Sequence, residues 1–322
     1  MKASSKSNVR IYLKWAIWVL VIQFILVNIS ASIYAYKFTH FYKSPPPKVA
    51  AQNIFVKTWK LFVGPSFYKN TGEPSPSFPF DTVHLKTSDG IQIEGWYSGS
   101  DTSKKCVIFF HGITVNKSYL ADEASVFRSW GYNVLLVDFR GHGRSGGSES
   151  TFGIKETGEV KSAFSFARSK GNKKIILYGV SMGAGVCIRA VHLNLVKPDA
   201  IIADMPFGTL RNHLRSRAAV LGFPSEPFAT LVTFWMGVEN GYNGFKYDIA
   251  SYAKDITCPV LIEWGEEDPY VKKYEIMKVF NNLSSGNKKM VAYASAGHES
   301  FLNFNPIKWQ TEVKAFIEKS DE

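Results

Sequence analysis

Residues 175–191 contain the feature that most restricts how this chain can fold. A short apolar run rich in β-branched residues leads into Gly-x-Ser-x-Gly at 179–183, and an apolar segment of helical composition follows. This order predicts a buried strand, a very tight turn and a helix. Gly179 and Gly183 permit a turn so sharp that a Cβ atom would not fit in it. We expect the turn to hold Ser181 in a strained conformation above the end of the strand.

The same motif has simpler interpretations, because it is common by chance. It can be a plain Gly/Ser loop between a strand and a helix, or a weak phosphate cradle. The segment lacks the Gly-Lys-Ser/Thr ending of a P-loop, so we set the phosphate interpretation aside. The decisive question is whether the chain supplies partners for Ser181 in the right order.

Strand and helix patterns alternate on both sides of the motif. A hairpin is expected around Asp89-Gly90, where apolar and polar residues alternate. From residue 106 onward, buried strands alternate with amphipathic helices, which predicts an α/β fold with a mostly parallel sheet and helices on both faces. The expected strands are 106–110, 134–137, 175–180, 200–203, 260–263 and 290–293, and the expected helices besides the one after Ser181 are 118–130, 155–169, 275–280 and 309–317.

Residues 210–252 interrupt this alternation. They are rich in aromatic residues and glycine, and they fall between two expected strands. An insertion at this place lies above the carboxyl ends of the strands, where open α/β sheets bind their ligands. We interpret the insertion as a small helical cap lined with apolar groups; the alternative is a plain surface excursion.

The N-terminal part of the chain has a different composition. Residues 1–14 are a basic tail, and residues 15–36 are an uncharged apolar stretch long enough to cross a hydrocarbon layer of about 30 Å as one helix. This predicts a transmembrane signal-anchor helix. The alternative is a cleavable signal peptide with Ser30-Ala31-Ser32 as the cleavage site. Four basic residues precede the stretch and three follow it before residue 49, which favours the extracytoplasmic side for the folded domain.

The formal net charge of +11 is concentrated at this end of the chain. Residues 1–48 hold seven basic residues and no acidic one, whereas the remainder holds 31 basic and 27 acidic residues. No nucleic-acid partner is therefore expected.

Residues 37–79 are expected to link the membrane helix to the folded domain. Ser44-Pro45-Pro46-Pro47 predicts a stiff, extended spacer. Within 54–63, aromatic residues alternate with Lys57 and Lys60, which indicates either an interfacial helix at the lipid headgroups or a segment that covers the edge of the domain.

Two later loops supply candidate partners for Ser181. The strand at 260–263 ends in an acidic loop that contains Asp268, and His298 directly follows the last strand. Serine is a poor nucleophile until a base takes its proton; His298 would be that base, and Asp268 would fix its tautomer. Glu266 or Glu267 could replace Asp268 in this role.

A developing negative charge on the substrate needs two backbone donors. One is the N–H of Met182, which the turn leaves unpaired at the start of the helix. The other is expected from the loop after strand 106–110, where Gly112 permits a close approach and Ile113 is the chosen donor. His111 in the same loop is expected to hold the loop by hydrogen bonds.

No metal or organic cofactor is expected. The three cysteines, Cys106, Cys187 and Cys258, lie in or beside apolar elements, and their spacing fits no zinc site. We interpret them as core residues.

Taken together, these motifs resemble the α/β-hydrolase superfamily of serine hydrolases from about residue 80 to the C-terminus. The likeness is greatest to the membrane-anchored branch with lysophospholipase-like, monoacylglycerol-lipase-like and depalmitoylase-like members. The resemblance implies that Ser181, Asp268 and His298 are nucleophile, acid and base, and that His142, Arg144 and Ser145 are architectural. The segments that carry it are 110–112, 138–145, 179–183, 259–268 and 297–298.

The sequence therefore predicts a membrane-anchored serine hydrolase that cleaves esters or thioesters of lipid-like acyl groups, with the hydrolase domain at 80–322. One alternative is an aminopeptidase-like amide hydrolase, which an acidic cap residue such as Glu226 or Glu239 would favour by holding a substrate amine. Another is an inactive binding protein. Residue types alone do not determine the acyl-chain length, the leaving group or the oligomeric state.

Overall fold

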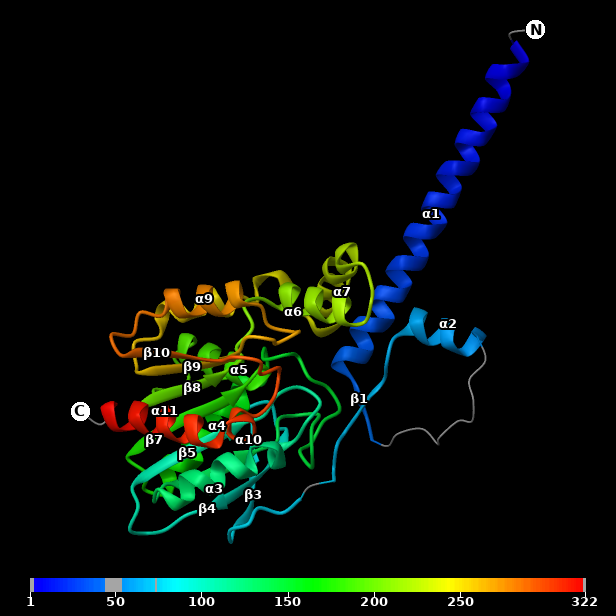
Figure 1. Ribbon diagram of the computed structural model, residues 1–322. Helices are drawn as coiled ribbons and strands as arrows, with labels where there is room; N and C mark the ends of the chain where they lie inside the picture. The colour runs from blue at the N-terminus through cyan, green and yellow to red at the C-terminus, as the bar shows by residue number, and fades with distance from the viewer. Residues whose placement is uncertain (1–2, 44–53, 73, 321–322) are drawn as a thin grey trace.

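An eight-stranded sheet forms the centre of the computed structural model, which describes residues 3–43, 54–72 and 74–320 (Figure 1). The strands are β3 (Asp81–Lys86), β4 (Gln92–Ser98), β5 (Lys105–Phe110), β6 (Asn133–Val137), β7 (Lys174–Val180), β8 (Ala200–Asp204), β9 (Val260–Gly265) and β10 (Lys288–Tyr293). Their order across the sheet is β10-β9-β8-β7-β5-β6-β4-β3. β4 is antiparallel to β3 and β6, and the pairs from β6 to β10 are parallel. The predicted mostly parallel sheet with an antiparallel opening is confirmed.

Helices cover both faces of the sheet, so strands β5 to β9 are buried over almost their whole length. On one face, α3 (Ala121–Ser129) and α11 (Pro306–Lys319) lie together, and the rings of Trp130 and Trp309 stack with centroids 6.2 Å apart. The other face carries α4 (Thr157–Ser169), α5 (Met182–His192) and α9 (Lys273–Asn282). The short elements are η1 (Lys117–Leu120), η2 (Gly244–Lys246), α8 (Ile249–Tyr252), η3 (Ala253–Asp255) and α10 (Phe301–Phe304).

Two helices interrupt the alternation between β8 and β9, as the composition indicates. They are α6 (Leu210–Val220) and α7 (Ser225–Asn240), which pack against each other and form the cap. α8, at the end of the same segment, packs instead against α5 and α9, and the side chain of Asn282 donates to the carbonyl of Ala250 at 2.6 Å.

A long N-terminal helix, α1 (Ala3–Thr39), projects from the domain (Figure 1). Its stretch Val9–Thr39 is, among the described residues, the one helix long and apolar enough to cross a membrane. Side chains from Val9 to Ile29 are almost all exposed, whereas Tyr34 and Phe38 are buried against the domain. The C-terminal end of α1 is therefore part of the folded domain.

Hydrogen bonds join the C-terminal part of α1 to the cap and to α2 (Ile54–Val63). The indole N–H of Trp235 on α7 donates to Asn28 Oδ1 at 3.3 Å, and Ser32 Oγ donates to Glu239 Oε1 at 3.2 Å. The hydroxyl of Tyr34 donates to the carbonyl of Leu61 on α2 at 2.5 Å. The cap and α2 thus both hold this one helix.

The chain beyond α1 pairs with the domain as well. His40 forms an antiparallel bridge with Glu149, and the N–H of Phe41 donates to the carbonyl of Ser148 at 2.7 Å. β1 (Phe41–Tyr42) then pairs in parallel with β2 (Phe67–Tyr68). The proline spacer predicted at 44–47 lies outside the described residues.

Candidate active site

Ser181 lies in the turn between β7 and α5. Its backbone has φ 54° and ψ −111°, a conformation that residues with a Cβ rarely adopt. A Cβ atom added at Gly183 would lie 2.1 Å from the carbonyl oxygen of Phe110, and one at Gly179 would lie 2.5 Å from the carbonyl carbon of Gly183. Backbone crowding therefore requires both glycines, and the predicted strained turn is confirmed.

The surroundings of Ser181 place it at the carboxyl edge of the sheet. Its N–H donates to the carbonyl of Asp204 at the end of β8, at 2.8 Å. The loop after β5 lies against it, since a Cβ atom at Gly112 would be 3.6 Å from Ser181 Cβ. Within the described chain the Ser181 hydroxyl makes no hydrogen bond, although the residue is only 3% exposed.

Asp268 and His298 are in direct contact at the same edge. Asp268 Oδ2 lies 2.6 Å from His298 Nδ1. The other carboxylate oxygen accepts the N–H groups of Tyr270 at 2.7 Å and Val271 at 3.0 Å, so the buried carboxylate is fixed on both sides. The imidazole is partly exposed, with 20% of its side-chain surface open.

The two loops that carry this pair are fastened to each other. The N–H of Glu267 donates to the carbonyl of Ala296 at 3.0 Å, and a Cβ atom at Gly265 would lie 2.4 Å from that same carbonyl oxygen. Glu266 and Glu267, the alternative candidates for the acid, are both exposed, and His298 bonds to neither of them in the described structure.

Ser181 and His298 follow strands that β8 and β9 separate. Because parallel strands end at one edge of a sheet, both residues lie at that edge. No hydrogen bond joins the serine to the imidazole in the part of the chain that the structure describes. The structure therefore brings the candidate acid and base together, with the candidate nucleophile on the same edge.

Two backbone N–H groups beside Ser181 are unused. Neither Met182 nor Ile113 donates a hydrogen bond to any described residue. The next N–H in the loop, that of Thr114, is directed to His142 Nε2 at 3.4 Å. Orphan N–H groups at a helix start and in a loop against the serine are available to an oxygen of a ligand.

His111 holds this loop in place, as the sequence predicts. The N–H of Phe139 donates to His111 Nε2 at 3.1 Å, so the proton of a neutral ring is on Nδ1, which lies 2.7 Å from the carbonyl of Gly112. Burial lowers the pKa of His111, which keeps the ring neutral.

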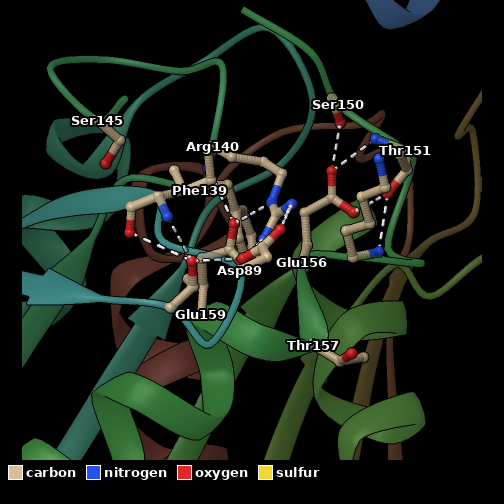
Figure 2. Close-up of polar contacts among 12 residues, drawn as sticks. Asp89, Phe139, Arg140, Ser145, Ser150, Thr151, Glu156, Thr157 and Glu159 are labelled. Carbon is tan, nitrogen blue, oxygen red and sulfur yellow. Dashed lines mark hydrogen bonds and ion pairs between the residues drawn. The ribbon is translucent and has the colours of Figure 1, made fainter. Parts of the chain in front are cut away.

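The loop after β6 is fixed by ion pairs (Figure 2). Arg140 Nε lies 2.6 Å from Glu159 Oε1, and its Nη1 lies 2.7 Å from Asp89 Oδ2. The hydroxyl of Ser145 donates to the carbonyl of Asp138 at 2.7 Å. The contacts of His142 and Ser145 are consistent with the architectural roles that the resemblance implies.

A second carboxylate shapes the segment that lies on Met182. Glu156 accepts the N–H of Thr151 at 2.6 Å, the N–H of Gly153 at 2.8 Å and the hydroxyl of Ser150 at 2.9 Å (Figure 2). Ser150 Oγ in turn lies 3.7 Å from Met182 Sδ. The start of α5 is thereby supported from the side.

A buried acid pair lies beneath the turn, and sequence analysis did not single it out. Asp204 and Glu263 are Cα partners on the neighbouring strands β8 and β9. Tyr178 OH donates to Asp204 Oδ2 and Tyr293 OH donates to Glu263 Oε1, each at 2.6 Å. The remaining oxygens, Asp204 Oδ1 and Glu263 Oε2, are buried without a partner among the described residues. Because the two residues are paired across neighbouring strands, a proton held between their carboxyl groups would satisfy both oxygens.

Arg217 of the cap is a second residue that sequence analysis missed. Its Nε donates to His213 Nε2 at 2.8 Å. The centre of the guanidinium group lies 5.2 Å from the ring of Tyr270 and 5.9 Å from the ring of Phe38. Tyr270 meets His298 edge-on at 5.4 Å, so Arg217 is one aromatic ring away from the candidate base.

The cap acids that an amine-binding site would use are already engaged. Glu226 pairs with Arg211 at 2.8 Å and accepts the hydroxyl of Thr230 at 2.6 Å, while Glu239 accepts the hydroxyl of Ser32 of α1. Among the described residues, no group of three or more His, Cys, Asp or Glu side chains is arranged to hold a metal ion. All three cysteines are free, and Cys258 is only partly buried.

An apolar cavity of about 310 Å³ lies between α1, α2 and the start of α7. The polar side chains on its wall point to α2, since Ser30 Oγ donates to the carbonyl of Phe62 at 2.6 Å and Tyr34 to that of Leu61. Its apolar walls include Leu26, Val27, Leu61, Phe62, Phe228 and Leu231. The volume is at the lower end of the range of about 300–1,000 Å³ for small-molecule sites.

Comparisons with known proteins relate the chain to hydrolases. Residues 101–232 match a family model described as serine aminopeptidase, S33. The chain is 24% identical to the uncharacterized protein YqkD of Bacillus subtilis over 242 residues, which cover 74% of this chain and 79% of that protein. It is 26% identical to the lysophosphatidylserine lipase ABHD12 of Xenopus tropicalis over 211 residues, 62% of this chain. That match covers 52% of the lipase, so the chain spans about half the length of this relative.

Solved structures give the same picture. The esterase Pf2001 of Pyrococcus furiosus is similar with a TM-score of 0.67 and 26% sequence identity, over 79% of this chain and 97% of the esterase. An esterase from Exiguobacterium antarcticum, at 17% identity and a TM-score of 0.56, shares the fold over 72% of this chain.

Proposed function

Because the chain is an α/β-hydrolase of the lipase and esterase type, which acts on esters, we propose that it is a serine hydrolase that uses Ser181, Asp268 and His298. The observation that carries the proposal is the 2.6 Å contact between Asp268 and His298 at the sheet edge that also holds the strained Ser181. An acid–imidazole pair on the same sheet edge as a serine in a strained turn is the arrangement that nucleophilic acyl transfer needs.

The contacts of His298 define its part in the reaction. With Nδ1–H donated to Asp268, Nε2 is the nitrogen that accepts the proton of Ser181. The serine oxygen attacks the acyl carbon, the bond to the leaving group breaks, and His298 returns the proton to that group. Water then gives a proton to His298 and attacks the acyl carbon; the bond from this carbon to the serine oxygen breaks, the acid leaves, and His298 returns the proton to Ser181.

The free N–H groups of Met182 and Ile113 are proposed as the oxyanion hole. Both belong to segments that backbone crowding holds beside Ser181, so they would not have to reorganise when charge develops. Loss of one such donor costs about 10²–10³ in rate in other enzymes.

We further propose that the substrate is a lipid-like acyl ester reached from a membrane, with the N-terminal helix as an uncleaved anchor and the N-terminus on the cytoplasmic side. The exposed stretch from Val9 to Ile29 is roughly 30 Å long as a helix, the thickness of a hydrocarbon core. On this proposal the apolar cavity lies at the base of the span, between α1 and two helices with exposed aromatic side chains, Phe55 and Trp59 on α2 and Phe234 on the cap helix α7. Exposed aromatic side chains at the end of a membrane span are typical of the membrane–water interface, which favours an interfacial role for α2.

The amide-hydrolase alternative has one argument in its favour, the name of the family model. The cap acids argue against it, because Glu226 is neutralised by Arg211 and Glu239 is bonded to α1. We therefore propose carboxylic esters or thioesters as substrates.

The test uses the full chain in its membrane fraction. A fluorophosphonate probe should label the wild type and not the Ser181→Ala variant, and p-nitrophenyl esters should be hydrolysed faster than aminoacyl amides. Labelling that persists in Ser181→Ala, or a preference for the amides, would refute the proposal. Protease accessibility of the domain in intact cells tests the orientation.

A further inference from the structure

We propose that Arg217 recognises an anionic group, a phosphate or carboxylate, on the substrate; this inference rests on the ester-hydrolase function proposed above. The acyl-transfer reaction specifies only the ester bond, and an anionic group elsewhere on the substrate would be a second recognition element. The residues around Arg217 come from three places: His213 from the cap, Tyr270 from the loop after β9, and Phe38 from the C-terminal end of α1.

The guanidinium group of Arg217 has no acidic partner among the described residues. Its Nε is used by His213, whereas its two terminal nitrogens make no hydrogen bond within the described chain. Arg140 is paired with two carboxylates (Figure 2) and Arg211 with Glu226, whereas Arg189, which also has no acidic partner among the described residues, donates to backbone carbonyls. A partly buried cation without a counter-charge is costly, and a bound anion would supply the missing charge.

The surrounding groups hold this cation in one orientation. The rings of Phe38 and Tyr270 flank the guanidinium group, and each face of such a ring attracts a cation. Since arginine can only donate, His213 Nε2 must be the acceptor, which puts the proton of the neutral ring on Nδ1. That buried Nδ1 has no acceptor among the described residues. The site thus offers a fixed two-nitrogen fork and a second orphan donor nearby.

The position of the fork links it to the reaction. Tyr270 packs edge-on against His298, and its N–H donates to Asp268. Phe38 is the buried end of α1, one helical turn below the wall of the apolar cavity at Tyr34. Arg217 therefore contacts both the end of α1, through Phe38, and the ring that packs against His298.

A purely structural role is the competing explanation, in which Arg217 only clamps α1 to the cap through the two rings. The last turn of α6, where Arg217 lies, also favours a cation through the helix dipole. The two roles differ chemically. A clamp affects all substrates alike, whereas a fork selects oxyanions that accept two parallel hydrogen bonds, which lysine reproduces only in charge.

The experiment compares two substrates that differ in one group: lauroyl glycerol and lauroyl glycerol phosphate. The wild type should have the higher kcat/KM for the phosphate. In Arg217→Met the ratio of the two kcat/KM values should fall about 10- to 100-fold, mainly through KM, since hydrogen bonds to charged groups contribute on this scale. Arg217→Lys should retain part of the preference.

Arg215→Met is the matched control, because Arg215 is an exposed cation on the same helix and pairs loosely with Glu226 at 3.7 Å. It should leave the ratio unchanged. An unchanged ratio in Arg217→Met, or an equal fall in Arg215→Met, would overturn the assignment. Absence of fluorophosphonate labelling in the wild type would instead refute the hydrolase function itself.

The anion site can also be tested in the wild type, so the test does not depend on whether Arg217→Met folds. Decyl phosphate should protect Ser181 from the fluorophosphonate probe at a concentration at least about tenfold lower than decanol does. Equal protection by the two amphiphiles would contradict an anion site.

Discussion

Replacement of Glu263 by glutamine should make the folded protein more stable above neutral pH. Glu263 is fully buried, and burial raises the pKa of its carboxyl group from an ordinary 4.5 to about 7. Asp204 beside it has its pKa raised well above the usual range, first by burial and then by the charge of Glu263. The pair therefore resists ionisation in the folded state.

The sign of the effect follows from proton binding. Between about pH 4.5 and 7 the unfolded chain has lost the Glu263 proton and the folded chain retains it, so stability falls as pH rises through this window and levels off above it. The two pKa values correspond to about 3 kcal/mol for this group. The Glu263→Gln side chain keeps an oxygen for the hydroxyl of Tyr293 and adds an N–H that can serve Asp204 without a titrating proton.

Thermal unfolding of the full chain in detergent at pH 5 and pH 8 measures this difference. The melting temperature of Glu263→Gln should exceed that of the wild type by about 5–10 °C at pH 8 and by much less at pH 5. Glu266→Gln, at an exposed position directly after β9, removes the same charge and should behave like the wild type. A Glu263→Gln curve that runs parallel to the wild-type curve over this range would refute the shared-proton explanation.

Three further outcomes are expected from the contacts described above. Asp268→Asn should lower kcat about 10⁴-fold with little change in KM, since an asparagine favours the wrong imidazole tautomer; steady-state kinetics with a p-nitrophenyl ester checks this, and a loss under about tenfold would contradict it. Lys117→Met leaves Asp138, which lies 2.8 Å from the Lys117 ammonium, buried without its cation, so chemical denaturation should show a loss of about 3–5 kcal/mol, and a loss under about 1 kcal/mol would be evidence against that pairing. Leu231→Trp should fill the apolar cavity and lower hydrolysis of long-chain esters in vesicles more than that of soluble short-chain esters; equal losses would mean that the cavity does not receive the acyl chain.

The turn at Ser181 was predictable because its constraint is local. A Cβ atom at Gly179 would lie 2.5 Å from the carbonyl carbon of Gly183, only four residues away, and this crowding within the turn leaves a visible mark in the sequence. The strands β5 to β9 were equally visible, since burial on both faces requires continuous apolar runs.

Contacts between distant segments were less accessible to sequence analysis. The pairing of Asp204 with Glu263 depends on the register of β8 against β9, and an acidic residue at the end of an apolar strand does not identify its partner. Arg217 is one of three arginines between residues 211 and 217, and only the packing of the cap shows which of them lacks an acid. The order of Ser181, Asp268 and His298 was readable, because each follows the carboxyl end of an apolar strand.

The joint between α1 and the cap has a mechanical consequence. Hydrogen bonds from Asn28, Ser32 and Tyr34 to α7 and α2 fix the orientation of α1 relative to the domain. If α1 crosses a bilayer, this fixed orientation sets the distance between the active site and the membrane surface. The enzyme would then hydrolyse only ester bonds that lie at that distance from the membrane plane.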